Sequence, residues 1–204
     1  MENKLLKLLI VGVSLFPFTT PVEAQTSGYS FVRYPNSQHI FAVKGNNKQH
    51  RPQNLRERAR EALKNANPAE QWAIKIYGPA AAQVIDIARK QANEETIKRY
   101  GADIDDTRNN AFKHCYWSGL ATSVIGPLHT KAFTDAHEAY VGEPGNWRRQ
   151  GPSRHKAMDL YNNQVGRSIG QYISFHRWRG WGREEIANVC QRFEQQDRLR
   201  VLIR

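Results

Sequence analysis

Apolar residues recur at three- and four-residue spacing along most of the chain after residue 54, a pattern typical of amphipathic helices. Asn67 followed by Pro68 predicts a helix start, and Gly78-Pro79 and Gly126-Pro127 predict interruptions. After the first interruption the predicted helices are 80–100, 108–125, 130–140, 154–175 and 183–199. We therefore expect an all-α fold, a compact single-domain bundle of five or six helices.

The stretch 108–125 is apolar almost all round, which is typical of a helix buried at the centre of a domain. Four of its polar residues form a stripe: they are spaced four apart and therefore share one face of the predicted helix. They are Asn110, His114, Ser118 and Thr122. Buried polar groups cost free energy unless they are paired or used, so this face is a candidate functional site.

The first 24 residues have the composition of a signal peptide. Lys4 and Lys7 precede an apolar run over 8–16, and 22–24 is a small-residue cleavage pattern. The run is too short for a membrane span, which needs about 20 apolar residues. We expect an exported protein, periplasmic or extracellular, with no transmembrane segment in the mature chain.

Three regions follow from these patterns. The signal peptide covers 1–24, and a polar, turn-rich segment over 25–53 predicts an extended or mobile arm with short strands at 29–34 and 39–43. The helical domain covers 54–204, with its motif-bearing core at 105–170.

The chain is basic, with 30 Lys and Arg residues against 19 Asp and Glu residues and a net charge of +11. This balance favours contact with an anionic envelope polymer or a lipid surface, and nucleic acid stays open as a partner. A basic exported protein without such a partner fits the charge equally well. The basic and aromatic residues suited to such contacts are Trp147, Arg148, Arg149, Arg177, Trp178, Arg179 and Trp181.

The two cysteines, Cys115 and Cys190, predict a single disulfide in an oxidising compartment. It would tie the central helix to the last one. Cys115 follows His114 directly, but adjacent helix residues point about 100° apart, so the two side chains do not face each other. We therefore expect a structural cysteine, not a thiol nucleophile.

Three short polar clusters interrupt otherwise apolar helices, and they supply the candidate catalytic residues. We predict that His114, Asp135 and Asp159 meet in one cluster contributed by three helices. The predicted supporting residues are Asn110, His137, Asn162, Asn163 and Arg167. Glu138 points further from the core face in this scheme and is expected at an exposed rim. Gly166 and Gly170 lie on a stripe of short residues that would let another helix approach closely.

Such a cluster could carry out two kinds of chemistry. His114, Asp135 and Asp159 could bind a divalent metal that activates water, or His114 could act as a base oriented by an aspartate. No His-Glu-x-x-His or paired Cys/His pattern supports the metal. A buried network that only fixes helix packing is the structural alternative.

The three clusters together resemble an uncharacterised bacterial domain of unknown function that occurs in exported and toxin-like proteins. The shared pattern is Asn-Ala-x-Arg/Lys-His-x-x-Trp at 110–117, Asp-x-His-Glu at 135–138 and Met-Asp-x-x-Asn-Asn-x-x-Gly-Arg at 158–167. The resemblance covers about residues 105–170 and implies no activity. From the residues themselves we expect a hydrolase acting on a cell-envelope component, or alternatively a non-enzymatic binder of anionic polymer or lipid.

Overall fold

The computed structural model describes residues 25–26, 29–33, 40–44, 63–176 and 182–203. The chain divides into two compact units, Met1–His50 and Arg51–Arg204, which are described separately. The predicted signal peptide lies outside the described residues, as do the basic and aromatic residues 177–181. None of the described helices is long and apolar enough to cross a membrane.

The first unit contains a small antiparallel sheet in the order β1 (Gln25–Thr26), β2 (Tyr29–Arg33) and β3 (Ile40–Lys44). Tyr29 pairs with Lys44 and Arg33 pairs with Ile40. Strands β2 and β3 fall within one residue of the two strands predicted here.

The second unit is helical and begins its first long helix at a strong cap. Asn67 accepts hydrogen bonds from the backbone N–H groups of Ala69 and Glu70, while Glu70 accepts one from the Asn67 N–H, which completes a capping box. Helix α2 (Pro68–Tyr100) follows. It bends at Gly78, where φ is +86° just before Pro79, as the predicted interruption requires.

Helix α3 (Arg108–His137) is the central element of the unit. Between Asn110 and Ser123 every residue except Lys113 is buried, which confirms the prediction for this stretch. It bends at Gly126, where φ is +81° before Pro127. The part after the bend ends at His137, with Glu138 as the C-cap, three residues before the predicted end at Tyr140.

Two short strands lie around the segment between the predicted helices 130–140 and 154–175. Strand β4 (Tyr140–Val141) pairs antiparallel with β5 (Arg148–Arg149). Gly142, with φ of +113°, lies in the turn between them, and its position against the Asn146 carbonyl leaves no room for a side chain. The segment is therefore a hairpin, and Arg148 and Arg149 are exposed on it.

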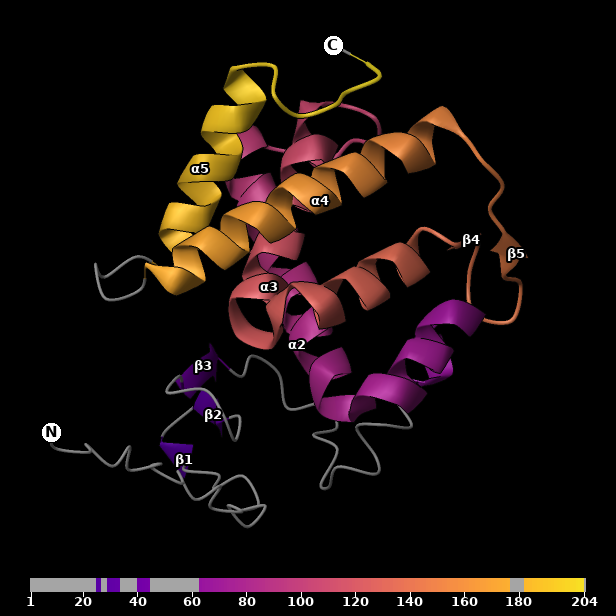
Figure 1. The fold of residues 1–204 in the computed structure, drawn as a ribbon, viewed down its shortest axis with the longest axis vertical. Helices are drawn as coiled ribbons and strands as arrows, with labels where there is room; N and C mark the ends of the chain where they lie inside the picture. The colour runs from indigo at the N-terminus through magenta and orange to yellow at the C-terminus, as the bar shows by residue number, and fades with distance from the viewer. Residues whose placement is uncertain (1–24, 27–28, 34–39, 45–62, 177–181, 204) are drawn as a thin grey trace, which may run out of the picture. The chain divides into compact units, whose positions relative to one another are not determined.

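Helices α4 (Arg154–Phe175) and α5 (Arg183–Gln195) complete the bundle. Figure 1 shows α4 crossing in front of α3, with α5 packed beside one end of α4. The core between these helices contains Phe112, Ile169, Ile173 and Ile186. The predicted all-α fold class is confirmed for this unit, with bends at both Gly-Pro positions.

Close backbone packing joins α3 to α4, as the stripe of short residues predicts. A Cβ atom added at Gly166 would overlap the backbone carbonyl of Cys115, and one added at Gly170 would overlap that of Gly119. Backbone atoms cannot swing aside as a flexible side chain does. The two glycines therefore set the distance between the helix that carries His114 and the helix that carries Asp159.

Gly166→Ala is expected to lower the free energy of unfolding by about 2 kcal/mol, because the added methyl group forces α3 and α4 apart. Chemical denaturation of the wild-type and variant proteins measures this. Gly151→Ala is the matched control, since a Cβ at Gly151 meets no atom within 4 Å. Equal stability of the Gly166 and Gly151 variants would contradict close packing of the two helices.

Candidate functional site

His114 lies at the centre of a polar cluster. The cluster is formed by the first part of α3, by α4 and by Glu138, the C-cap of α3. His114 is buried, with 6% of its surface exposed. Its Nδ1 atom lies 3.3 Å from Asn163 Oδ1 and 3.5 Å from Glu138 Oε1, and its Nε2 atom lies 3.4 Å from Asp159 Oδ1. Both ring nitrogens therefore face oxygen atoms supplied by other parts of the chain.

Asn163 determines which ring nitrogen carries the proton. Its Nδ2 donates to Glu138 Oε1 at 3.3 Å, and its Oδ1 accepts a hydrogen bond from the Ser118 hydroxyl at 2.8 Å. The Asn163 oxygen is thus an acceptor toward His114, so Nδ1 is the protonated nitrogen. The lone pair of Nε2 is left facing Asp159.

Glu138 occupies the position that the sequence prediction gave to Asp135. The prediction of an exposed rim was wrong, because Glu138 is buried, with 6% of its surface exposed. The helix ends one residue earlier, at His137, and the bend at Gly126 turns this part of α3 by an amount that helical spacing cannot give. The acid that reaches His114 from here is Glu138.

Asp159 is the most accessible member of the cluster. Its side chain is 16% exposed, against 8% for both His114 and Glu138. With its amide nitrogen turned toward Asp159, Asn110 donates to Asp159 Oδ1 at 3.2 Å and its oxygen accepts from Lys113 Nζ at 3.1 Å. Asn110 and His114 therefore both contact Oδ1 of Asp159, and Asp159 forms the open edge of the site.

Burial shapes the protonation of the cluster. It raises the pKa of Asp159 to about 7, with further contributions from the negative charges of Glu138 and Asp106. Burial also raises the pKa of Glu138 and lowers that of His114 to about 3, helped by the positive charge of Lys113. Near neutral pH the imidazole is therefore neutral, and the two carboxyl groups resist being ionised together.

Asp135 and Arg167, both predicted at the site, lie together beside it instead. Asp135 Oδ1 is 3.8 Å from Arg167 Nη1, and its other oxygen pairs with Lys131. Arg167 also donates to the Thr134 hydroxyl at 3.0 Å. The predicted meeting of His114 with both aspartates is thus right for Asp159 and wrong for Asp135, which no contact joins to His114 in the described residues.

His137 belongs to a second cluster at the start of α2. Its Nδ1 lies 3.0 Å from Glu70 Oε1, and its ring packs edge-on against Trp117 at 5.2 Å between centroids. Burial lowers the pKa of His137, but the hydrogen bond with Glu70 and the charge of Glu138 outweigh it and raise the pKa overall. Trp117 also contacts the ring of His114, so it separates the two histidines.

Asn162 has a structural position away from the cluster. Its side chain donates to the Arg200 carbonyl and accepts from the Arg200 N–H, both at 2.9 Å. It is fully buried and fixes the C-terminal segment against α4. Adjacent Asn162 and Asn163 therefore serve different contacts, because neighbouring helix positions point about 100° apart.

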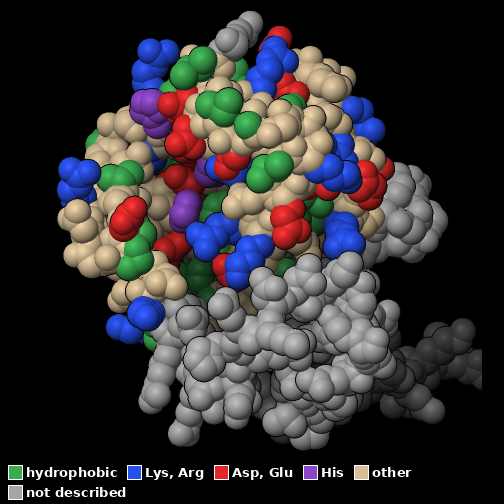
Figure 2. Space-filling model, turned by 180° about the vertical axis from the view of Figure 1, so that it is seen from behind, with side chains coloured by type: hydrophobic (Ala, Val, Ile, Leu, Met, Phe, Trp, Pro, Cys, Tyr) green, Lys and Arg blue, Asp and Glu red, His purple; other side chains and the backbone are tan. Residues whose placement is uncertain are grey.

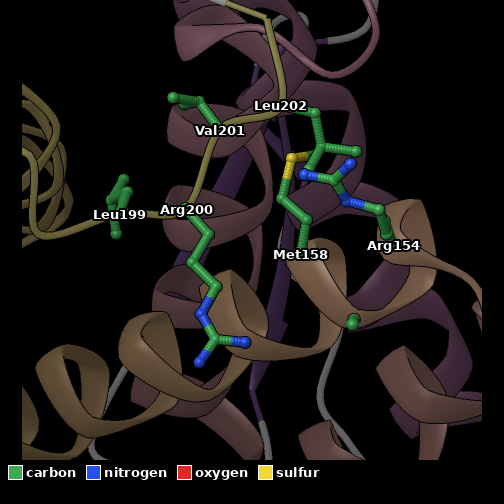
Figure 3. A pocket seen from close by; sticks show the side chains of 7 residues that line it. Arg154, Met158, Leu199, Arg200, Val201 and Leu202 are labelled. Carbon is green, nitrogen blue, oxygen red and sulfur yellow. The ribbon is translucent and has the colours of Figure 1, made fainter.

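Concave regions occur on the surface formed by the described residues. Figure 2 shows acidic and histidine side chains gathered along a hollow on one face. A separate cavity of about 340 Å³ lies between the start of α4 and the C-terminal segment. In Figure 3, Met158, Arg154 and Leu202 lie together on one side of that cavity, and Arg200 lies apart from them. His114, Glu138 and Asp159 do not line this cavity.

Comparison with protein families classifies the chain. The family described as a domain of unknown function, DUF6973, matches residues 72–195. The chain belongs to this family. The match contains the His114 cluster and both cysteines, so the DUF6973 domain includes the whole site described above. This match confirms the predicted resemblance to a domain of unknown function. Searches of curated proteins and of solved structures find no match.

Proposed function

We propose that this DUF6973 protein is an exported hydrolase that acts on a component of the cell envelope, with water activated at Asp159. The proposal rests on the arrangement of the cluster, in which His114 and Glu138 are buried and Asp159 is partly exposed. Export rests on the signal-peptide pattern of residues 1–24. The three-part sequence pattern supports a bacterial domain of secreted proteins.

The proposed step begins with a water molecule at the exposed side of Asp159. The Asp159 carboxylate takes one proton as the water oxygen attacks the carbonyl or phosphoryl centre of the substrate. The resulting carboxylic acid donates a hydrogen bond to Nε2 of neutral His114. As the bond to the leaving group breaks, Asp159 returns the same proton to it. Asn163 and Glu138 hold the imidazole in the tautomer that this exchange requires.

A purely structural network explains the arrangement less well. Two carboxyl groups are packed against one neutral imidazole, and among the described residues no Lys or Arg pairs with either Glu138 or Asp159. Apolar side chains of similar volume would pack the helices at a lower free-energy cost. The unbalanced negative charge at an open edge favours a site that binds something positive or donates a proton.

Incubation of the purified mature protein with isolated envelope components tests the proposal. Peptidoglycan and phospholipid vesicles are suitable substrates, with released amino groups, reducing ends, fatty acids and phosphate as readouts. We expect time-dependent release from one of them and its loss in His114→Gln. Absence of release from every component would overturn the hydrolase proposal.

The second candidate function is non-enzymatic binding of an anionic polymer or lipid. Arg148 and Arg149 are exposed on the β4–β5 hairpin, and the chain carries a net charge of +11. If binding uses this hairpin, Arg148→Glu with Arg149→Glu weakens co-sedimentation with anionic vesicles at least about tenfold, and binding by the wild-type protein falls steeply with salt. Unchanged co-sedimentation would exclude the hairpin as the binding surface.

A further inference from the structure

We propose that His114, Glu138 and Asp159 bind one divalent transition-metal cation, of the Zn²⁺ or Mn²⁺ class. The inference deepens the proposed function: with the cation bound, it would take over from the Asp159 carboxylate as the group that activates the water, and this use in catalysis rests on the proposed function. The binding itself does not, because it follows from the positions of the donor atoms.

The distances between the donor atoms suit a single small cation. One ligand atom from each of the three residues can be chosen so that all lie within 4.8 Å of one another. Nε2 of His114 and Oδ1 of Asp159 are 3.4 Å apart, close to the edge of about 3.4 Å expected for a tetrahedral site with bonds of about 2.1 Å. Glu138 supplies the third ligand atom of this set, and its Oε1 atom lies 3.5 Å from the other ring nitrogen of His114, Nδ1.

The hydrogen bonds around His114 prepare it as a ligand. A histidine that binds a metal through one nitrogen usually donates from the other to an oxygen atom, which fixes the ring and its tautomer. Here the Asn163 oxygen lies 3.3 Å from Nδ1, and Ser118 holds that oxygen at 2.8 Å. Nε2 is thus left with a lone pair that faces a carboxylate oxygen, and two facing lone pairs need a proton or a cation between them.

Charge favours the cation over a purely protein-bound network. Lys113 is the nearest basic residue in the sequence, but it pairs with Asp103 at 2.6 Å. Neither Glu138 nor Asp159 has an ion pair with Lys or Arg in the described part of the chain. A divalent cation would balance both carboxylates in an environment where burial makes their charge expensive.

The chemistry of the donors selects the class of cation. Ca²⁺ and Mg²⁺ prefer all-oxygen ligands, whereas imidazole with carboxylate suits Zn²⁺, Mn²⁺ and similar ions. Three protein ligands leave a position open for water on the exposed side of Asp159. A cation there lowers the pKa of its bound water and would supply hydroxide for the proposed hydrolysis.

Isothermal titration of the EDTA-treated, dialysed protein with ZnCl₂ and with MnCl₂ tests the inference. We expect one equivalent to bind, and Glu138→Gln to weaken the binding at least about tenfold. Asp135→Asn is the matched control, because this carboxylate pairs with Lys131 and Arg167 and not with His114. It should bind within about twofold of the wild-type protein. Circular dichroism of each variant verifies the helical fold, and Asp159→Asn replaces Glu138→Gln if the latter does not fold.

Two further results separate this inference from the proposed function. Stoichiometric binding that depends on Glu138 supports the metal site even if no envelope component is hydrolysed, in which case the hydrolase proposal fails alone. Turnover by EDTA-treated protein that binds neither cation overturns the metal site and leaves the hydrolase standing. Binding that is equally strong in wild-type and folded Glu138→Gln protein also overturns the assigned site.

Discussion

Asp159→Asn is expected to lower the rate of substrate hydrolysis at least about 100-fold while the fold is retained. The amide removes the group that takes the proton from water, and general acid–base catalysis typically contributes about 10²–10⁴-fold. Because Asp159 is partly exposed and similar in size to asparagine, the substitution opens no cavity. The measurement is product release per unit of enzyme, with thermal unfolding recorded for the same samples.

Asp135→Asn provides the control, since both positions were equal candidates by sequence. Asp135 is an aspartate on α3 that pairs with Lys131 and Arg167, so its replacement should leave turnover within about twofold of the wild-type value. A loss of activity in the Asp135 variant with full activity in the Asp159 variant would place the chemistry at Arg167 and not at His114.

Reduction of the disulfide is the second large effect, and it acts on stability. Cys115 and Cys190 are bonded across 75 residues of sequence, and both side chains are fully buried. Loop-closure entropy gives about 4 kcal/mol for a loop of this length, which corresponds to a fall of roughly 10 °C in Tm. Thermal unfolding of oxidised and fully reduced protein measures the difference.

The state of the thiols in the purified protein decides whether this bond operates. The sequence predicts the pair and the structure confirms it. Titration of free thiols after denaturation without reductant should find neither cysteine free. Two titratable thiols, or equal Tm values before and after reduction, would contradict a stabilising disulfide. The bond joins α5 to the turn of α3 that carries His114, so its loss should also loosen the site.

Local signals were sufficient for much of the fold. Asn67 before Pro68 predicts the start of α2, and the Gly-Pro pairs at 78–79 and 126–127 predict the bends, because each acts through backbone geometry within a few residues. The all-polar stripe on a helix that is otherwise apolar likewise predicts that His114 is buried. These inferences need no knowledge of how helices are placed relative to one another.

Which residues form the site depends on how the helices are placed relative to one another. Asp135 and Glu138 are three residues apart, and periodicity of an unbroken helix places Asp135 nearer the core face, so it favours the wrong acid. The bend at Gly126 and the end of α3 at His137 turn Glu138 toward His114. Asn162 shows the same limit, because its partner is the backbone of Arg200, in a segment that has no helical pattern.

The tautomer of His114 in the cation-free protein tests the central claim most directly. Nitrogen–proton NMR spectra of protein isotope-labelled at histidine, with the His114 signals assigned by their loss in His114→Gln, report which ring nitrogen carries the proton. We predict a neutral ring at neutral pH with the proton on Nδ1, which leaves Nε2 free toward Asp159 for a proton or a cation. A proton on Nε2, donated to Asp159, would instead make the cluster a satisfied structural network and contradict both the proposed hydrolase and the metal site.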